Sequence, residues 1–137
     1  MTDRAMQGAA LIIINNKNEI LLMLRDNIPE IPFPDMWDIP GGHVELNEVP
    51  EQTIKREMME EMGFDVGEIH FFRKYGRENL TDNIFWKRAD LNPDIIILKE
   101  GQRIKYFSRE EIKDLHLAFN YNEVLEDFFN YIESKNE

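Results

Sequence analysis

The sequence predicts a single α+β domain in which a β-sheet lies between helices. Strand-like segments come first, a long amphipathic helix follows, and further strand-like segments precede two more helices. The 137 residues suit one compact domain, and the 42% of apolar residues suffice for a hydrophobic core. Because no repeat, low-complexity tract or linker interrupts this order, we expect residues 1–137 to form one domain.

The first two expected strands form a hairpin near the N-terminus. Residues 7–15 are a continuous apolar run, which is typical of a strand buried on both faces. The turn residues 15–18 separate this run from a second expected strand, residues 19–25. Residues 27–38 contain three prolines and should form a loop.

A helix with recognisable ends should follow this loop. Asn47 suits the N-cap, Pro50 is tolerated in a first turn, and Gly63 suits the position just beyond the C-terminus. An apolar stripe at helical spacing runs along it and consists of Ile54, Met58 and Met62. These features predict an amphipathic helix between residues 47 and 63.

The second half of the chain carries more strand signals and two helix starts. The expected strands are residues 66–75, 84–89, 95–98 and 103–107. Ser108 and Glu111 form a capping box that opens a short helix, and Asn120 or a neighbour should cap the last helix. The apolar face of that last helix consists of Val124, Leu125, Phe128 and Ile132.

The composition excludes several classes of protein. With no cysteine, the chain has no disulfide framework, thiolate zinc site or cysteine nucleophile. The net charge of −11 and the lack of a basic stripe argue against binding to duplex nucleic acid or to an anionic membrane. Residues 1–8 lack the apolar segment of a signal peptide, so we expect a cytoplasmic protein. Bound divalent cations would reconcile this acidic chain with a phosphate-containing substrate.

Three glutamates share one arc of the central helix. Glu57, Glu60 and Glu61 are spaced i, i+3 and i+4, and each pair of like charges costs roughly 0.2–0.5 kcal/mol of helix stability. A hard cation such as Mg²⁺ would turn this repulsion into a binding site. An ordinary acidic, solvated helix face is the alternative.

Residues 42–64 resemble the Nudix box, G-x5-E-x7-R-E-U-x-E-E-x-G-U, where U is a bulky apolar residue. The matching positions are Gly42, Glu48, Arg56, Glu57, Met58, Glu60, Glu61, Gly63 and Phe64. Residues 37–42 also look like the usual lead-in of the family. The resemblance implies a Nudix-type α/β/α sandwich with a mixed central sheet, and a loop–helix–loop that holds a catalytic metal.

This resemblance also implies roles for individual residues. Arg56 would act in the site by pairing with Glu48 to brace the loop against the helix, and Glu48 is also a candidate to touch metal. Glu100 lies in a segment similar to the late loop of MutT-like members, where it is a ligand or base; an ordinary loop acid is an equally weighted alternative. Glu57 is the first choice for the general base. The implied metal ligands are Gly41 through its carbonyl, Glu57, Glu60, Glu61 and Glu100.

Candidates for substrate binding lie elsewhere in the chain. Arg25 could reach a phosphate, although a solvated strand end explains it as well. Phe33 and Trp37 could stack on a base, whereas packing is the more common role of a tryptophan. Asn120 and Asn122 lie where some MutT-like proteins place a base-reading asparagine. His43, His70 and His116 show no metal-ligand spacing.

The resulting hypothesis is a Mg²⁺-dependent hydrolase, with Mn²⁺ as a substitute, that cuts the phosphoanhydride of a nucleoside diphosphate linked to another moiety. A nucleoside triphosphate, a nucleotide sugar or ADP-ribose would fit, with a slight preference for the MutT-like group. We expect a small-molecule nucleotide as the partner and a monomer or homodimer. The alternative is a non-catalytic, nucleotide-sensing Nudix module, which the complete set of box glutamates disfavours.

Overall fold

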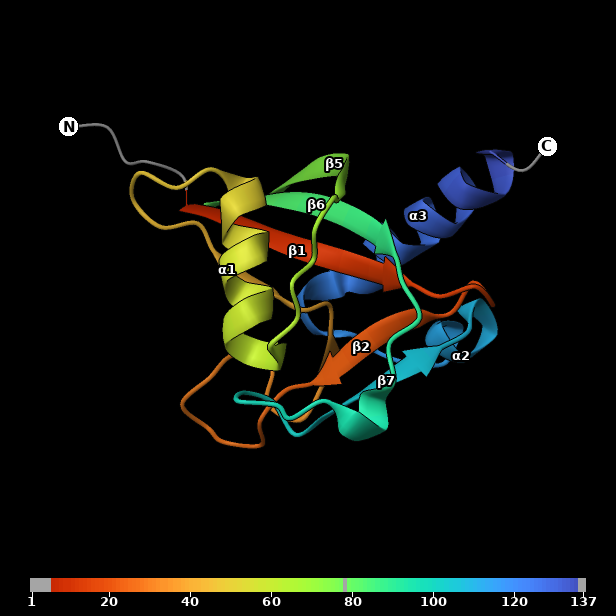
Figure 1. Ribbon diagram of the computed structural model, residues 1–137, viewed down its shortest axis with the longest axis horizontal. Coiled ribbons are helices and arrows are strands. Elements are labelled where there is room, and N and C mark those ends of the chain that lie inside the picture. The colour runs from red at the N-terminus through yellow and green to blue at the C-terminus, as the bar shows by residue number, and fades with distance from the viewer. Residues whose placement is uncertain (1–5, 78, 136–137) are drawn as a thin grey trace.

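The computed structural model describes residues 6–77 and 79–135 (Figure 1). The strands are β1 (Met6–Ile14), β2 (Ile20–Leu24), β3 (Trp37–Asp38), β4 (Gly41–His43), β5 (His70–Arg77), β6 (Leu80–Arg88) and β7 (Arg103–Phe107). The α-helices are α1 (Pro50–Met62), α2 (Arg109–Lys113) and α3 (Tyr121–Lys135), and the short 3₁₀ turns are Pro93–Ile95 and Ala118–Asn120. None of the helices in the described residues is long and apolar enough to cross a membrane.

These strands form one mixed sheet, as the sequence predicts. Its order is β3-β2-β1-β6-β5, with β4 also paired to β1 and β7 also paired to β2. The β1–β6 pair is parallel and the other pairs are antiparallel. The predicted hairpin is confirmed by the pairing of Ile14 with Ile20.

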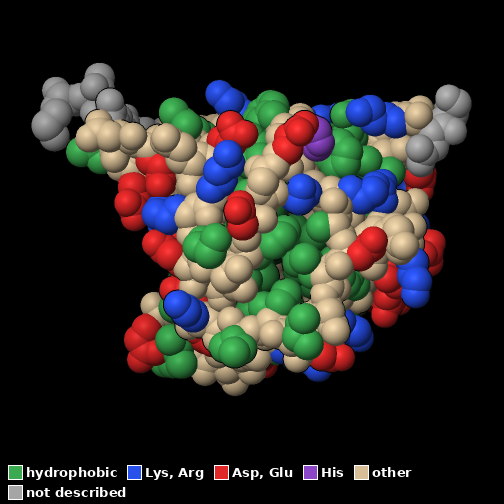
Figure 2. Space-filling view, viewed as in Figure 1, with side chains coloured by type: hydrophobic (Ala, Val, Ile, Leu, Met, Phe, Trp, Pro, Cys, Tyr) green, Lys and Arg blue, Asp and Glu red, His purple; other side chains and the backbone are tan. Residues whose placement is uncertain are grey.

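Helices cover both faces of the sheet, which gives the expected α/β/α layers (Figure 1). Leu11 and Ile13 of β1 pack in the cluster that contains the apolar stripe of α1. Ile12 and Ile14 alternate with them and pack in the cluster that contains the apolar face of α3. β1 is therefore buried on both sides, which explains its continuous apolar sequence. Over the α1 face, hydrophobic side chains gather in the middle and charged ones surround them (Figure 2).

One strand prediction and part of one loop prediction were wrong in kind. Residues 95–98 form no strand: the 3₁₀ turn ends at Ile95, and Ile95 and Ile97 are exposed while Ile96 and Leu98 pack on the core. Exposed and packed side chains thus alternate as they would in a strand, but among the described residues no neighbouring strand pairs with this segment. Within the expected loop 27–38, Trp37 and Asp38 form the short strand β3, because they pair with the end of β2.

Other element boundaries shifted. The strand expected at 66–75 is β5, which begins at His70, and the strand expected at 84–89 is β6, which begins at Leu80. Pairing between β5 and β6 sets these limits.

The helix ends follow backbone geometry more than side-chain type. α1 is capped by Val49 and not by Asn47, because Pro50, which lacks an N–H, takes the first helical position. Gly63 ends α1 with φ of 64°, as predicted. The capping box of Ser108 also forms. Asn120, one of the candidate caps of the last helix, has φ of 57°, and its side-chain amide donates to Glu123.

Candidate active site

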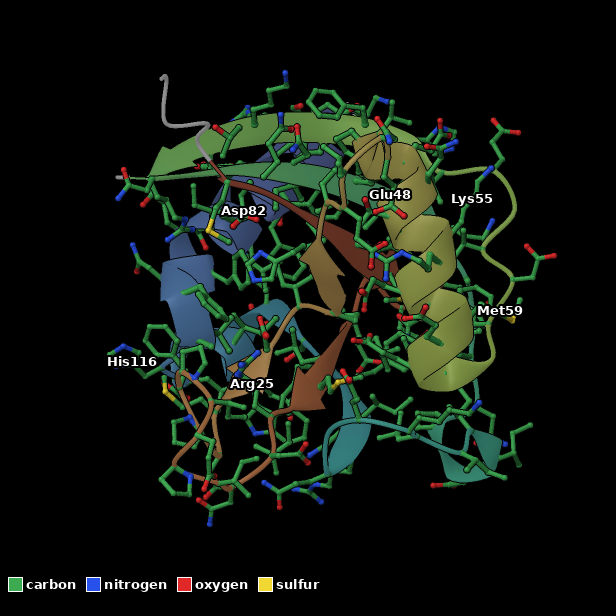
Figure 3. The ribbon with its side chains drawn as sticks, turned by 90° about the vertical axis from the view of Figure 1, so that its left-hand side faces the viewer. Arg25, Glu48, Lys55, Met59, Asp82 and His116 are labelled. Atoms are coloured by element: carbon green, nitrogen blue, oxygen red, sulfur yellow. The ribbon has the colours of Figure 1, made fainter. Side chains whose placement is uncertain are left out.

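A cleft of about 550 Å³ opens where β1, β4, α1 and the C-terminal segment meet. One side carries residues of the Nudix box and its neighbour Glu100, and the floor carries Gly8 to Ala10 at the start of β1. The lining also includes Asp38, Phe119 and Tyr121 together with Arg25 and Asp82, and Figure 3 shows Arg25 and Asp82 across from α1. Another hollow, of about 560 Å³, lies along residues 93–105 and is not lined by the box carboxylates.

Arg56 braces the loop that precedes α1. Its Nε and Nη2 donate to the two carboxylate oxygens of Glu48 at 2.8 and 3.1 Å, and Nη2 also donates to the carbonyl of His43 at 3.2 Å. The guanidinium and the Thr53 hydroxyl lower the pKa of Glu48 to about 2. On its other side, Nη1 donates to Glu57 at 2.7 Å. The structure thus forms the pairing that the resemblance implied, and the same arginine orients Glu57.

Among the glutamates of the cleft, Glu61 is the most withdrawn from solvent, with 6% of its surface exposed. Its Oε2 is buried and has no hydrogen-bond partner among the described residues. Burial, followed by the charges of Glu57 and Glu100, raises the pKa of Glu61 well above the ordinary value of 4.5. Glu100 comes this close because the Lys99 N–H donates to the Glu61 carbonyl at 3.0 Å. The late-loop glutamate therefore joins the box glutamates in space.

The two glycines of β4 allow this close packing. A Cβ on Gly41 would lie 2.1 Å from the Ala9 carbonyl oxygen, and so β4 could not pair with β1. A Cβ on Gly42 would lie 2.5 Å from the carboxylate carbon of Glu57. Only glycine at these positions lets the Glu57 carboxylate lie directly against the backbone.

The three box glutamates do not converge as one group. The side chain of Glu60 is 59% exposed, lies 3.4 Å from Arg56 and does not line the cleft, whereas Glu57 and Glu61 do. Among the described residues, no three acidic or histidine side chains are already arranged to hold a metal ion. The unpartnered oxygen of Glu61, beside two further carboxylates, nevertheless fits a hard divalent cation, which prefers carboxylate oxygens.

Comparison with known proteins adds to this geometry. The NUDIX domain family model matches residues 5–128. The chain belongs to this family. The sequence-based family assignment is thereby confirmed, and the mixed sheet with helices on both faces is the fold of the Nudix structures that it resembles.

Named relatives of this Nudix protein act on a nucleotide. An 8-oxo-dGTP diphosphatase of Proteus vulgaris is 35% identical over 66 residues, covering 48% of this chain and 57% of that protein. The 8-oxo-dGTP diphosphatase of Escherichia coli is 34% identical over 71 residues, covering 52% and 54%. The chain thus spans about half the length of these curated relatives. The MutT protein of Methanosarcina mazei has the same fold, with a TM-score of 0.73, 22% identity and coverage of 100% and 99%.

Arg25 of the Nudix domain lines the cleft, but much of its guanidinium is engaged. Nε donates to the Pro32 carbonyl at 2.9 Å and Nη1 donates to Asp38 at 2.9 Å. The group also lies 5.1 Å from the ring centre of Phe119. Phe33, 41% exposed, packs edge-on against Phe119 and does not line the cleft. Arg25 therefore fixes the position of its neighbours in addition to facing the cleft.

The two candidate asparagines lie outside the cleft lining. The Asn122 oxygen accepts from the Leu117 N–H at 2.9 Å, and its nitrogen donates to the Leu115 carbonyl at 2.9 Å. These bonds hold the segment between α2 and α3 and occupy both ends of the amide. Trp37 packs edge-on against Phe107 and joins the core, as its packing interpretation predicted.

Sequence reasoning missed part of the Nudix cleft. Asp38 and Asp82 are buried, at 9% and 3% exposure, and Tyr121 beside them is also buried. Burial raises the pKa of Asp38 to about 6, against the opposing effect of Arg25. His43 lines the cleft as well. Asp38 lies within the recognised lead-in and could have been found there; Asp82 carried no signal, because its position depends on strand register.

Proposed function

We propose that this Nudix protein is a divalent-metal-dependent hydrolase of the phosphoanhydride bond in a nucleoside diphosphate linked to another moiety. The observation that carries the proposal is the buried, unpartnered oxygen of Glu61 beside Glu57 and Glu100 in an open cleft. Phosphoryl transfer depends on positioning and charge neutralisation, and a divalent cation held by carboxylates can supply both to a bound diphosphate.

Glu57, Glu61 and Glu100, with the Gly41 carbonyl, would hold the cation, which we propose is Mg²⁺ with Mn²⁺ as a substitute. When bound, it would neutralise diphosphate oxygens and make the attacking water more acidic. Glu57 would accept a proton from that water, and Glu100 is the other candidate for this role. The water oxygen attacks one phosphorus, and the bond from that phosphorus to the bridging oxygen breaks. Arg56 keeps Glu57 in place through its 2.7 Å contact.

The cleft suits a small nucleotide. Its volume of about 550 Å³ is within the usual range for small-molecule sites. The names of the relatives make an oxidised purine nucleoside triphosphate the first substrate to test. ADP-ribose and nucleotide sugars are the further candidates.

The test is a hydrolysis screen with Mg²⁺ across nucleoside triphosphates including 8-oxo-dGTP, ADP-ribose and nucleotide sugars, with products separated by anion-exchange chromatography. We expect turnover that EDTA abolishes and that Glu57→Gln and Glu61→Gln each lower by at least about 100-fold. Glu68→Gln, a change at an exposed glutamate after α1, is the matched control and should leave turnover unchanged. Metal-independent activity, or full activity in Glu61→Gln, would refute the proposal.

A further inference from the structure

The late loop, residues 99–102, is fixed on both sides of Glu100. On one side, the Lys99 N–H donates to the Glu61 carbonyl at 3.0 Å. On the other side, Gly101 has φ of 80°, and a Cβ there would lie 2.7 Å from the sulfur of Met23. Glu100 is thus held between α1 and the end of β2, and the contacts of the residue after Gly101 bear on how closely it approaches Glu61.

That residue, Gln102, joins the late loop to residues 25–36, the loop between β2 and β3. Its backbone N–H donates to the Leu24 carbonyl at 2.8 Å. Its side-chain amide donates to the Arg25 carbonyl at 2.7 Å and to the Asp35 carboxylate at 2.8 Å. The amide therefore reaches both ends of the 25–36 loop and uses both of its N–H donors.

The 25–36 loop forms part of the wall around the candidate metal ligands. A hollow of about 220 Å³ is lined by residues of this loop and by Gly41, Glu61 and Glu100. Gln102 is exposed and does not line the hollow, so it does not contact the site directly. Any effect of its side chain on the site passes through the two loops that it joins.

We propose that Gln102 is a positioning residue, which sets how closely Glu100 approaches Glu61 by holding the late loop on the 25–36 loop. This inference rests on the proposed function, because it assumes that the two carboxylates share a cation. Replacing a group that orients a metal ligand typically lowers metal affinity roughly 10- to 100-fold. An exposed hydrogen bond that served only the fold would change stability and leave metal affinity as it is.

Gln102→Met tests the inference, because methionine has a similar size but no donor for Arg25 or Asp35, while the backbone N–H can still reach Leu24. Titration of the nucleotide-free full chain with Mn²⁺, followed by electron paramagnetic resonance of the free ion, measures metal affinity without turnover. We expect the variant to bind Mn²⁺ about 10-fold more weakly than the wild type.

Amide hydrogen exchange gives a second readout, on the 25–36 loop itself. Two hydrogen bonds close this loop, from the Arg25 N–H to the Met36 carbonyl at 2.9 Å and from the Asp35 N–H to the Asp26 carbonyl at 3.1 Å. Because Gln102 ties down both ends of the loop, these two N–H groups should exchange about 10-fold faster in Gln102→Met.

Asn130→Leu is the matched control, since it also replaces an amide by an apolar group of similar size. The Asn130 oxygen accepts from Arg109 at 2.9 Å and thereby ties α3 to α2, outside the cleft. This variant should keep the wild-type Mn²⁺ affinity and loop exchange. Gln102→Asn, whose shorter amide cannot reach both acceptors, should weaken Mn²⁺ binding by a smaller factor and decides in the same way if Gln102→Met fails to fold.

Wild-type Mn²⁺ affinity in Gln102→Met, whatever the loop exchange, overturns the inference, and so does an equal loss of affinity in Asn130→Leu. Weaker Mn²⁺ binding in Gln102→Met without hydrolysis by the wild type would refute only the proposed hydrolysis. Hydrolysis by the wild type with equal Mn²⁺ affinity in the two proteins would refute only this inference. No Mn²⁺ binding by the wild type would refute both.

Discussion

Replacement of Glu61 by glutamine tests whether the buried Glu61 carboxylate lowers the free energy of unfolding of the protein. The side chain keeps its size but loses its charge, and the new amide can donate to the neighbouring Glu57 and Glu100. Because burial and these two carboxylates raise the pKa of Glu61 above neutrality, the folded wild type must hold a proton there that the unfolded chain releases at pH 7. The variant removes that requirement.

The size of the effect follows from this proton linkage. Holding a proton against an ordinary pKa of 4.5 costs about 1.4 kcal/mol per pH unit, so the upper bound at pH 7 is about 3 kcal/mol. Relaxation and solvent access lower this, and we expect Glu61→Gln to gain about 1–3 kcal/mol. For a domain of this size, each kcal/mol raises the melting temperature by roughly 4 °C.

The direction in which folding stability changes with pH follows from the raised pKa of Glu61. A folded state that binds the proton more tightly than the unfolded chain loses stability as the pH rises above 4.5. The advantage of Glu61→Gln should therefore be near zero at pH 4 and grow toward pH 8. Added Mg²⁺ should raise the melting temperature of the wild type but not that of the variant, since an ion that binds only the folded state stabilises it.

Thermal unfolding in EDTA at several pH values, followed by circular dichroism, measures these differences. Glu60→Gln is the control, because its exposed side chain makes only a long contact with Arg56 and should change stability by less than about 0.5 kcal/mol. A melting temperature of Glu61→Gln at or below that of the wild type at pH 7–8, or an advantage that does not depend on pH, would refute the reasoning.

Three further changes test the surrounding structure. Arg56→Lys cannot reproduce the two hydrogen bonds to Glu48, so urea denaturation should show that the free energy of unfolding falls by about 1.5–3 kcal/mol. An unchanged urea midpoint would show that Arg56 does not hold the loop against α1. Gly42→Ala places a Cβ against Glu57, so turnover should fall at least about 10-fold while circular dichroism shows a folded protein; wild-type kcat would count against it. Asn122→Ala should cost about 1–3 kcal/mol in urea and leave KM unchanged, whereas a KM effect alone would restore its substrate-binding role.

Local rules predicted the local parts of this molecule. The two-faced burial of β1, the end of α1 at Gly63 and the capping box at Ser108 depend on neighbouring residues, and each was predicted correctly. The prediction of a strand at 95–98 was wrong because an alternating apolar pattern indicates only which side chains are buried. A strand also needs a neighbouring strand to pair with, and the sequence of the segment does not show whether one is present.

The parts of the site that the sequence did not predict depend on distant segments. Helical spacing placed Glu57, Glu60 and Glu61 on one arc, but only the packing of the late loop shows that Glu100 approaches Glu61 while Glu60 faces outward. Asp82 reaches the cleft because the parallel β1–β6 register places it opposite Gly8. A slip by one residue would turn its side chain to the other face of the sheet.

The architecture explains how the fold tolerates an unfavourable cluster of acids. Glu57 and Glu61 project from an arc of α1 that adjoins the stripe of Ile54 and Met58, both fully buried, which packs against β1. Rotation of α1 to separate the carboxylates would therefore expose apolar surface, which costs about 25 cal/mol per Å². Arg56 neutralises one neighbour but makes no contact with Glu61, so the residual repulsion is concentrated on a single buried oxygen at the cleft. A cation that binds there takes the place of the Glu61 proton and relieves a repulsion that the packing of the core maintains.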